Sequence, residues 1–201
     1  MAVRSGMADL ISRMRTLVND SGTAATWTDQ ELQDILDAHK WRIMREQLAS
    51  ERTLTSGTTY EYKVYHSRYG NFEGGGTAYF KIEDSTGLSK GTAYAVDYIA
   101  GVVTMNDDQE GTALYLTGWY YDINAAAADT WRLWMGKTAD RYDVQLDGHR
   151  MSRAQWFRHC QTMAQHYDAI SEPVNVRMWR TSDFSINPTS SRSNRFKPVE
   201  D

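Results

Sequence analysis

The residue types best suited to chemistry, histidine and cysteine, gather in one stretch of the C-terminal third. His159 and His166 are seven residues apart and so share one face of a predicted helix, with Cys160 beside the first. A closed tetrahedral metal site needs about four ligands, usually three or four residues apart when they lie on one helix. No further ligand completes this set, so the spacing favours packing and surface roles over a metal site.

The sequence offers no strong candidate for a catalytic nucleophile. The chain lacks a G-x-S-x-G motif, and its single cysteine, Cys160, lies on the predicted buried stripe of its helix, where a thiol is usually inert. We therefore expect a protein that is not an enzyme and that carries no cofactor. A small hydrolase using His149, His159 or His166 stays open as a third class, because active sites assemble from residues distant in sequence.

Two loops with suggestive compositions are expected to be structural. The glycines at 74–76 lack the Lys and Ser or Thr of a phosphate loop and lie between β segments, which predicts a flexible loop tip. The sequence NDDQEG at 106–111 lacks the alternation and flanking helices of an EF-hand, so a polar hairpin turn is favoured over a calcium site.

The overall composition excludes several classes of protein. The 201 residues include 22 Lys and Arg against 26 Asp and Glu, a net charge of -4, which argues against a dedicated nucleic-acid binder. The single cysteine excludes an intramolecular disulfide framework. No apolar run approaches the roughly 20 residues of a membrane span, and the N-terminal residues lack the apolar region of a secretory signal. We expect a soluble protein of a reducing compartment.

Residue usage changes along the chain and predicts an α+β fold. Ten of the 14 glycines and nine of the 12 tyrosines fall in the middle third, where Tyr, Val and Thr favour strands, whereas the flanks are rich in helix formers. The expected organisation is a four-helix core with an inserted antiparallel β lobe and an extended C-terminal arm. Its boundaries are 1–50 for the first helices, 51–118 for the β lobe, 119–171 for the last helices and 172–201 for the arm.

Periodicity places the four helices. The first covers about 7–19, and the second begins at a capping box formed by Thr28 and Glu31, with Trp27 as a hydrophobic staple, and runs to about Gln47. The third covers about 123–142, and the fourth begins after a second capping pair, Ser152 and Gln155, and ends near Ile170. The buried stripes expected on the second and fourth helices are Leu32, Ile35, Leu36, His39 and Ile43, and Phe157, Cys160, Met163, Ala164 and Tyr167.

Period-two patterns and turn residues predict the strands of the β lobe as a meander of four or five antiparallel strands. They are expected at 60–67, 77–84, 93–100, 102–105 and 112–121. Tyrosines in this lobe could bind carbohydrate or single-stranded nucleic acid by stacking, but acidic residues are interleaved with the basic ones. Core and subunit-contact roles are therefore favoured for most of these tyrosines.

The arm at 172–201 combines large apolar side chains with arginines in an aperiodic, polar sequence. Aromatic residues and Arg dominate binding energy at protein interfaces, so this pattern favours docking onto another protein. The alternative is an arm that packs back on its own domain.

Three pieces of the sequence, in this order, resemble the head-to-tail adaptor (connector) proteins of tailed bacteriophages. They are WTDQELQDILDAHK after a short amphipathic helix, AYAVDYIAGVVTM with a glycine between two strands, and YYDINAAAADTWRLWMGK followed by DGHRMSRAQWFRHCQTMAQHY. Together they lie within residues 8–170. The β insertion is larger than the one carried by the smallest members of the family.

The resemblance implies a structural virion protein located in the neck, at the head–tail interface, and assembled in the host cytoplasm. Such proteins form a ring of about twelve copies under the portal protein, extend the DNA channel, let genomic DNA pass without specific binding, and offer a docking surface to a stopper or tail protein. Their C-terminal segment reaches the portal. The expected portal-docking residues are Arg177, Trp179, Arg180, Phe184, Arg195 and Phe196. The alternative function is a virion binding module whose Tyr-rich β lobe recognises a glycan or another virion protein.

Overall fold

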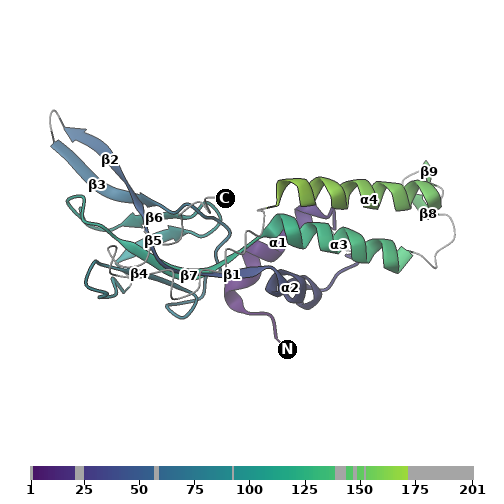
Figure 1. The fold of residues 1–201 in the computed structure, drawn as a ribbon, viewed down its shortest axis with the longest axis horizontal. Coiled ribbons are helices and arrows are strands. Elements are labelled where there is room, and N and C mark those ends of the chain that lie inside the picture. Colours follow the sequence, from purple (N-terminus) through teal and green to yellow (C-terminus); the bar gives the residue numbers. More distant parts are fainter. Residues whose placement is uncertain are drawn as a thin grey trace, which may run out of the picture.

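The four α-helices lie at one end of the molecule and strands β1 to β7 at the other, so the fold is α+β (Figure 1). The computed structural model describes residues 2–20, 25–56, 59–91, 93–138, 144–146, 149–151 and 153–171. Within these residues, no helix combines the length and the apolar character needed to cross a membrane.

The described chain contains four α-helices that share one hydrophobic core. They are α1 (Ala8–Leu17, after a 3₁₀ turn at Ser5–Met7), α2 (Asp29–Ala38), α3 (Ile123–Thr138) and α4 (Arg153–Ile170). Apolar side chains recur on one face of each helix, so all four helices contribute to the cluster. Its fully buried members include Met7, Leu10, Met14, Leu32, Leu36, Ala126, Ala127, Ala128 and Cys160.

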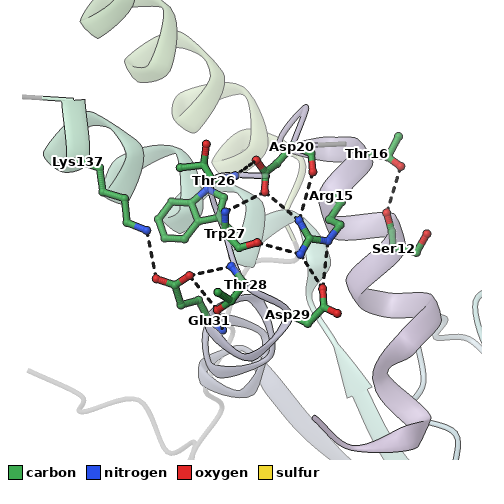
Figure 2. A network of polar contacts seen from close by, with 10 residues as sticks. All are labelled: Ser12, Arg15, Thr16, Asp20, Thr26, Trp27, Thr28, Asp29, Glu31 and Lys137. Carbon is green, nitrogen blue, oxygen red and sulfur yellow. Dashed lines mark hydrogen bonds and ion pairs between the residues drawn. The ribbon is translucent and has the colours of Figure 1, made fainter. Parts of the chain in front are cut away.

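The connection from α1 to α2 is held by Arg15 and the buried carboxylate of Asp20 (Figure 2). The Asp20 carboxylate accepts hydrogen bonds from the backbone N–H groups of Thr26 (2.7 Å) and Trp27 (3.1 Å). The Arg15 guanidinium donates to Asp20 (3.0 Å), to the Trp27 carbonyl (2.9 Å) and to Asp29 (2.6 Å). A buried carboxylate is stable only when it is paired in this way, so these bonds fix the approach of the two helices.

The predicted capping box is confirmed at the start of α2. The Glu31 N–H donates to the Thr28 hydroxyl, and the Thr28 N–H donates to the Glu31 carboxylate at 2.8 Å (Figure 2). These Thr28 hydrogen bonds and the ammonium of Lys137 on α3 hold the pKa of Glu31 below its usual value. The same Lys137 ammonium lies 3.6 Å from the centroid of the Trp27 ring, so the capped end of α2 is also joined to α3.

The prediction that this helix continues to Gln47 is wrong. Helix α2 ends at Ala38, and Lys40–Gln47 form strand β1, which pairs antiparallel with β7 (Tyr115–Tyr121). Ile43 is seven residues after Leu36 and so fitted the helical stripe, but it packs in a second core, among the strands. The local spacing of apolar residues fits either a helix or a strand here, and pairing with β7 makes the segment a strand.

Strands β1 to β7 form two sheets, and the predicted meander is wrong. One sheet has the order β1-β7-β4 and the other the order β2-β3-β6-β5, so β3 and β4, β4 and β5, and β6 and β7 lie in different sheets. The remaining strands of these sheets are β2 (Ala49–Ser56), β3 (Thr59–His66), β4 (Phe80–Glu83), β5 (Tyr94–Asp97) and β6 (Val102–Met105). The five predicted strands overlap β3 to β7, whereas β1 and the polar strand β2 were not predicted. The second core, between the sheets, includes Tyr65, Phe72, Ile82, Val103, Leu114 and Leu116.

The end of α3 and the start of α4 flank a short hairpin of β8 (Val144–Leu146) and β9 (His149–Met151). The described part of α3 ends at Thr138, and the expected continuation at 139–142 and the capping residue Ser152 lie outside the described residues.

The buried stripe of α4 differs from the predicted one at its first position. Cys160, Ala164 and Tyr167 are buried as expected, but Phe157 is 50% exposed. Trp156 instead points toward the core, and its ring lies 5.8 Å from that of Trp134 on α3. One residue rotates a helix by about 100°, so an aromatic pair at adjacent positions leaves the periodicity ambiguous.

We predict that Thr28→Ala lowers the free energy of unfolding by about 1 kcal/mol, because the variant leaves the Glu31 N–H without its side-chain acceptor. Chemical denaturation measures the loss. The matched control is Thr16→Ala, an exposed position inside α1 where the stability should change by less than about 0.5 kcal/mol. Equal effects of the two substitutions would contradict the role given to the capping box.

Candidate functional site

The residues expected to dock onto a portal lie outside the described residues. Arg177, Trp179, Arg180, Phe184, Arg195 and Phe196 all belong to 172–201. Their role stays a prediction. The described residues contain two polar arrangements that bear on function, one buried and one open to solvent.

The buried arrangement, which we call the junction network, joins the helices to the strands. It consists of Arg4 before α1, Asp37 on α2, Glu73 in the loop between β3 and β4, and Tyr121 at the end of β7. The Arg4 guanidinium donates to both Asp37 carboxylate oxygens (2.6 and 2.8 Å) and to Glu73 (2.6 Å). The Tyr121 hydroxyl donates to Glu73, and it accepts from Arg4 at 3.1 Å. Four segments distant in sequence therefore meet at one charged cluster.

The loop that carries Glu73 is positioned by close backbone packing. The Gly74 N–H donates to the Gly6 carbonyl at 3.3 Å, and a Cβ added to Gly6 would lie 2.1 Å from the Gly74 oxygen. Glycine is required at such a close approach. The prediction that 74–76 form a flexible loop tip is therefore wrong at Gly74, which is buried against the N-terminal segment.

The charged groups of the junction network stabilise one another by hydrogen bonds and opposite charge. Burial works against the ionised form of Asp37, but the hydrogen bonds and charge of Arg4 outweigh it and lower the Asp37 pKa. The pKa of Arg4 is raised, mainly by its hydrogen bonds to Asp37 and in smaller part by Glu73. Burial and the neighbouring Glu73 carboxylate raise the pKa of the Tyr121 hydroxyl, so it stays protonated as a donor.

This network has the chemistry of a structural clamp. Glu73 is 2% exposed and Tyr121 is 1% exposed, and each is already bonded within the network. A general acid or base must reach a substrate proton, and a nucleophile must be accessible. The adjacent hollow, lined by Gly6, Gly74 and Tyr98 among others, has a volume of only about 170 Å³.

The histidines and the cysteine do not come together. Burial raises the pKa of the Cys160 thiol to about 11, which makes it a poor nucleophile at neutral pH. The His159 ring contacts Trp131 and Trp156, whereas the His166 ring contacts Tyr167. The side chain of His149 lies outside the described residues. No group of three His, Cys, Asp or Glu side chains in the described part of the chain could hold a metal ion.

The acidic loop at 106–111 turns the chain, but the predicted hairpin is wrong, because it joins β6 to β7, which lie in different sheets. The Asp108 carboxylate accepts from the backbone N–H groups of Tyr62 and Glu110, both at 2.9 Å, and these bonds lower its pKa. The carboxylate therefore stabilises the backbone of the turn.

The second arrangement is an open groove of about 860 Å³, which we call the β1 groove. It is lined by strand β1, the start of β2, the end of β3 and the residues after β3, including Trp41, Arg42, Glu46, Arg68 and Tyr69. Its aromatic floor includes Trp41 and the stacked rings of Tyr69 and Tyr120, whose centroids are 4.5 Å apart. Trp41 is 41% exposed, so a large aromatic surface is open to a partner.

The Arg68 guanidinium is exposed and has no ion-pair partner among the described residues, whose ion-paired arginines are Arg4, Arg15 and Arg132. The Glu46 carboxylate accepts hydrogen bonds from the Ser67 hydroxyl (2.8 Å) and the Arg68 N–H (3.1 Å). The Arg42 side chain points to the face of β1 opposite to Trp41, because neighbouring strand residues alternate, and its guanidinium lies 5.6 Å from the centroid of the Trp119 ring. A carboxylate of a partner is the natural ligand for the Arg68 guanidinium.

Sequence reasoning missed both arrangements. Trp41 and Arg42 were expected in a helix, whereas they belong to strand β1, and only the aromatic and β-branched content of 41–43 suggested a strand. Arg4 and Glu73 are 69 positions apart, and neither lies in a motif. In the sequence, only the placement of Tyr121 and Asp122 directly before a predicted helix pointed to the junction network.

Neither a comparison with protein-family models nor one with curated proteins finds a match for this chain. Function is therefore argued from its own residues and their arrangement.

We predict that Arg4→Ala lowers the free energy of unfolding by roughly 2–4 kcal/mol, because it leaves the buried Glu73 carboxylate without its cation. The control is Arg13→Ala, on the exposed face of α1. Since the folded protein lowers the Asp37 pKa, this stabilisation is present above the unfolded value near 4 and is lost as the pH falls through the folded value. Denaturation between about pH 3 and 7 should show the difference between wild type and variant shrinking at acid pH. A difference that is constant or grows there would contradict the assignment.

Proposed function

We propose that this protein is a head-to-tail adaptor of a tailed bacteriophage, a non-enzymatic structural component of the virion neck. It forms a ring under the portal, extends the DNA channel and offers a docking surface to a stopper or tail protein. The observation that carries the proposal is the order and packing of the elements. Helices α1 to α4 share one core, and the sheets of β1 to β7 are inserted between α2 and α3, an order that composition and periodicity predicted and that supports the resemblance.

Exposed apolar side chains on the helices support ring formation. Leu133 on α3 is 49% exposed, and Phe157 and Ile170 on α4 are each 50% exposed. Interfaces of permanent assemblies are more apolar than ordinary protein surface, so these residues are candidates for contacts between neighbouring copies.

The charge of the chain supports passage of DNA. With a net charge of -4, a ring of these chains has no excess of cations to hold phosphates. Genomic DNA would then move through the lumen without specific binding. The arm at 172–201 is the proposed attachment to the portal.

The alternative, recognition of a glycan or another virion protein by a Tyr-rich β lobe, has less support. Of the nine tyrosines between 51 and 120, Tyr60 alone is exposed. Tyr65 is fully buried, and the other seven are half-buried. Stacking of sugars needs accessible ring faces, whereas packed rings serve the core.

Deletion of residues 172–201 should leave a folded protein that no longer attaches to the portal. Mass photometry of the full chain mixed with portal rings from the same phage should detect a complex with the symmetry of the portal, and the truncated chain should not form it. Absence of a complex with the full, folded chain would contradict the adaptor proposal, and unfolding of the truncated chain would contradict the docking role of the arm.

The substitution Phe157→Glu should raise the protein concentration needed for ring formation at least about tenfold, because it places a charge in an apolar contact between copies. The control is Gln161→Glu, one turn further along α4 and also exposed. Light scattering of portal-bound assemblies measures ring formation, and thermal denaturation checks that both variants fold. Ring formation by Phe157→Glu at the wild-type protein concentration would exclude this face of α4 from the ring contact.

A further inference from the structure

The β1 groove and the arm are complementary in chemistry. The groove offers an aromatic floor that includes Trp41 and Tyr69, beside Arg68, which has no carboxylate partner among the described residues. Within 172–201, Asp183 and Phe184 are the one adjacent pair of an acidic and an aromatic residue.

If residues 183–186 are extended, their acidic and apolar side chains would point to opposite sides of the segment. Phe184 and Ile186 are two residues apart, so both side chains lie on the same side of an extended segment, and Asp183 lies on the other. The apolar side would face the aromatic floor, and Asp183 would lie at the rim near the exposed Arg68. Strand β1 is also an edge of its sheet, with backbone groups available to an added strand.

The described chain ends close to this groove. The Ile170 carbonyl, at the end of α4, accepts a hydrogen bond from the Asn124 side chain at 3.4 Å. Asn124 is four residues after Tyr120, which lines the groove, and four residues span at most about 14 Å. Asp183 lies twelve positions after Ser171, a length of chain that can span about 40 Å and is ample to reach the groove.

We propose that the β1 groove binds the arm of its own chain, with Phe184 and Ile186 on the aromatic floor and Asp183 paired with Arg68. The groove is thus a binding site for an extended acidic–aromatic peptide. This proposal does not depend on the adaptor function: loss of portal binding would leave it standing, and an empty groove would leave the adaptor proposal standing.

Hydrogen exchange of the full-length protein tests the proposal. Backbone amides of 183–187 should exchange at least about tenfold more slowly than in a free peptide of the same sequence. Asp183→Arg should remove this protection, and the double variant Asp183→Arg with Arg68→Asp should restore it, because the charges are exchanged. The control Asp201→Arg, at another acidic position of the arm, should keep it. Wild-type amides that exchange as fast as the free peptide, or a double variant without restoration, would overturn the proposal.

Crosslinking separates binding within one chain from exchange between copies. The full-length variant Arg68→Cys with Asp183→Cys should form a disulfide within one chain at all protein concentrations, since the native Cys160 is buried. The control pair, Arg13→Cys with Asp183→Cys, places the first thiol on α1 and should not crosslink. Disulfide-linked dimers would assign the groove to the arm of a second copy and overturn the assignment to the same chain, as would the absence of any disulfide.

Discussion

The ion pair between Arg4 and the buried carboxylate of Glu73 is the interaction on which the arrangement of the two cores depends. A carboxylate that is 2% exposed is costly unless it is paired and hydrogen-bonded. Arg4 and Tyr121 supply those bonds, and Arg4 also holds Asp37 on α2. The N-terminal segment, the loop before β4, helix α2 and strand β7 therefore meet at one point, which fixes how they lie relative to one another.

The two covalent connections between the cores reinforce this geometry. His39 alone separates α2 from β1, and Asp122 alone separates β7 from α3. The Asp122 N–H donates to the His39 carbonyl at 3.0 Å, and the Asp122 carboxylate accepts from the N–H groups of Asn124 and Ala125 at the start of α3. The β1–β7 ladder thus continues directly into the helices. With no flexible linker at either crossing, the β1 groove keeps a set position relative to the helix ends.

The sequence predicted the elements whose signals are local and failed where distant residues decide. The capping box of Thr28 and Glu31 is complete within four residues, so the start of α2 was predictable. The end of α2 was not, because Ile43 continues the helical stripe and only pairing with β7 makes 40–47 a strand. Likewise, the adjacent Trp156 and Phe157 fit the α4 stripe equally well until Trp134 is in place. The junction network and the β1 groove depend wholly on such distant pairings.

Taken together, the two proposals require that the arm change partners. A segment tethered to its own groove is present there at an effective concentration of about 1 mM, so a portal must compete with that contact before it can bind the arm. The competition lowers the apparent affinity of the protein for the portal, because only arms that are free of the groove can bind it. An open groove with one exposed ion pair binds an extended segment weakly, because solvent screens the charges and the chain loses entropy when it is ordered. Under the two proposals, a weak contact would protect the apolar side chains of the arm in the free protein and would still yield to a ring in which many arms bind a portal at once.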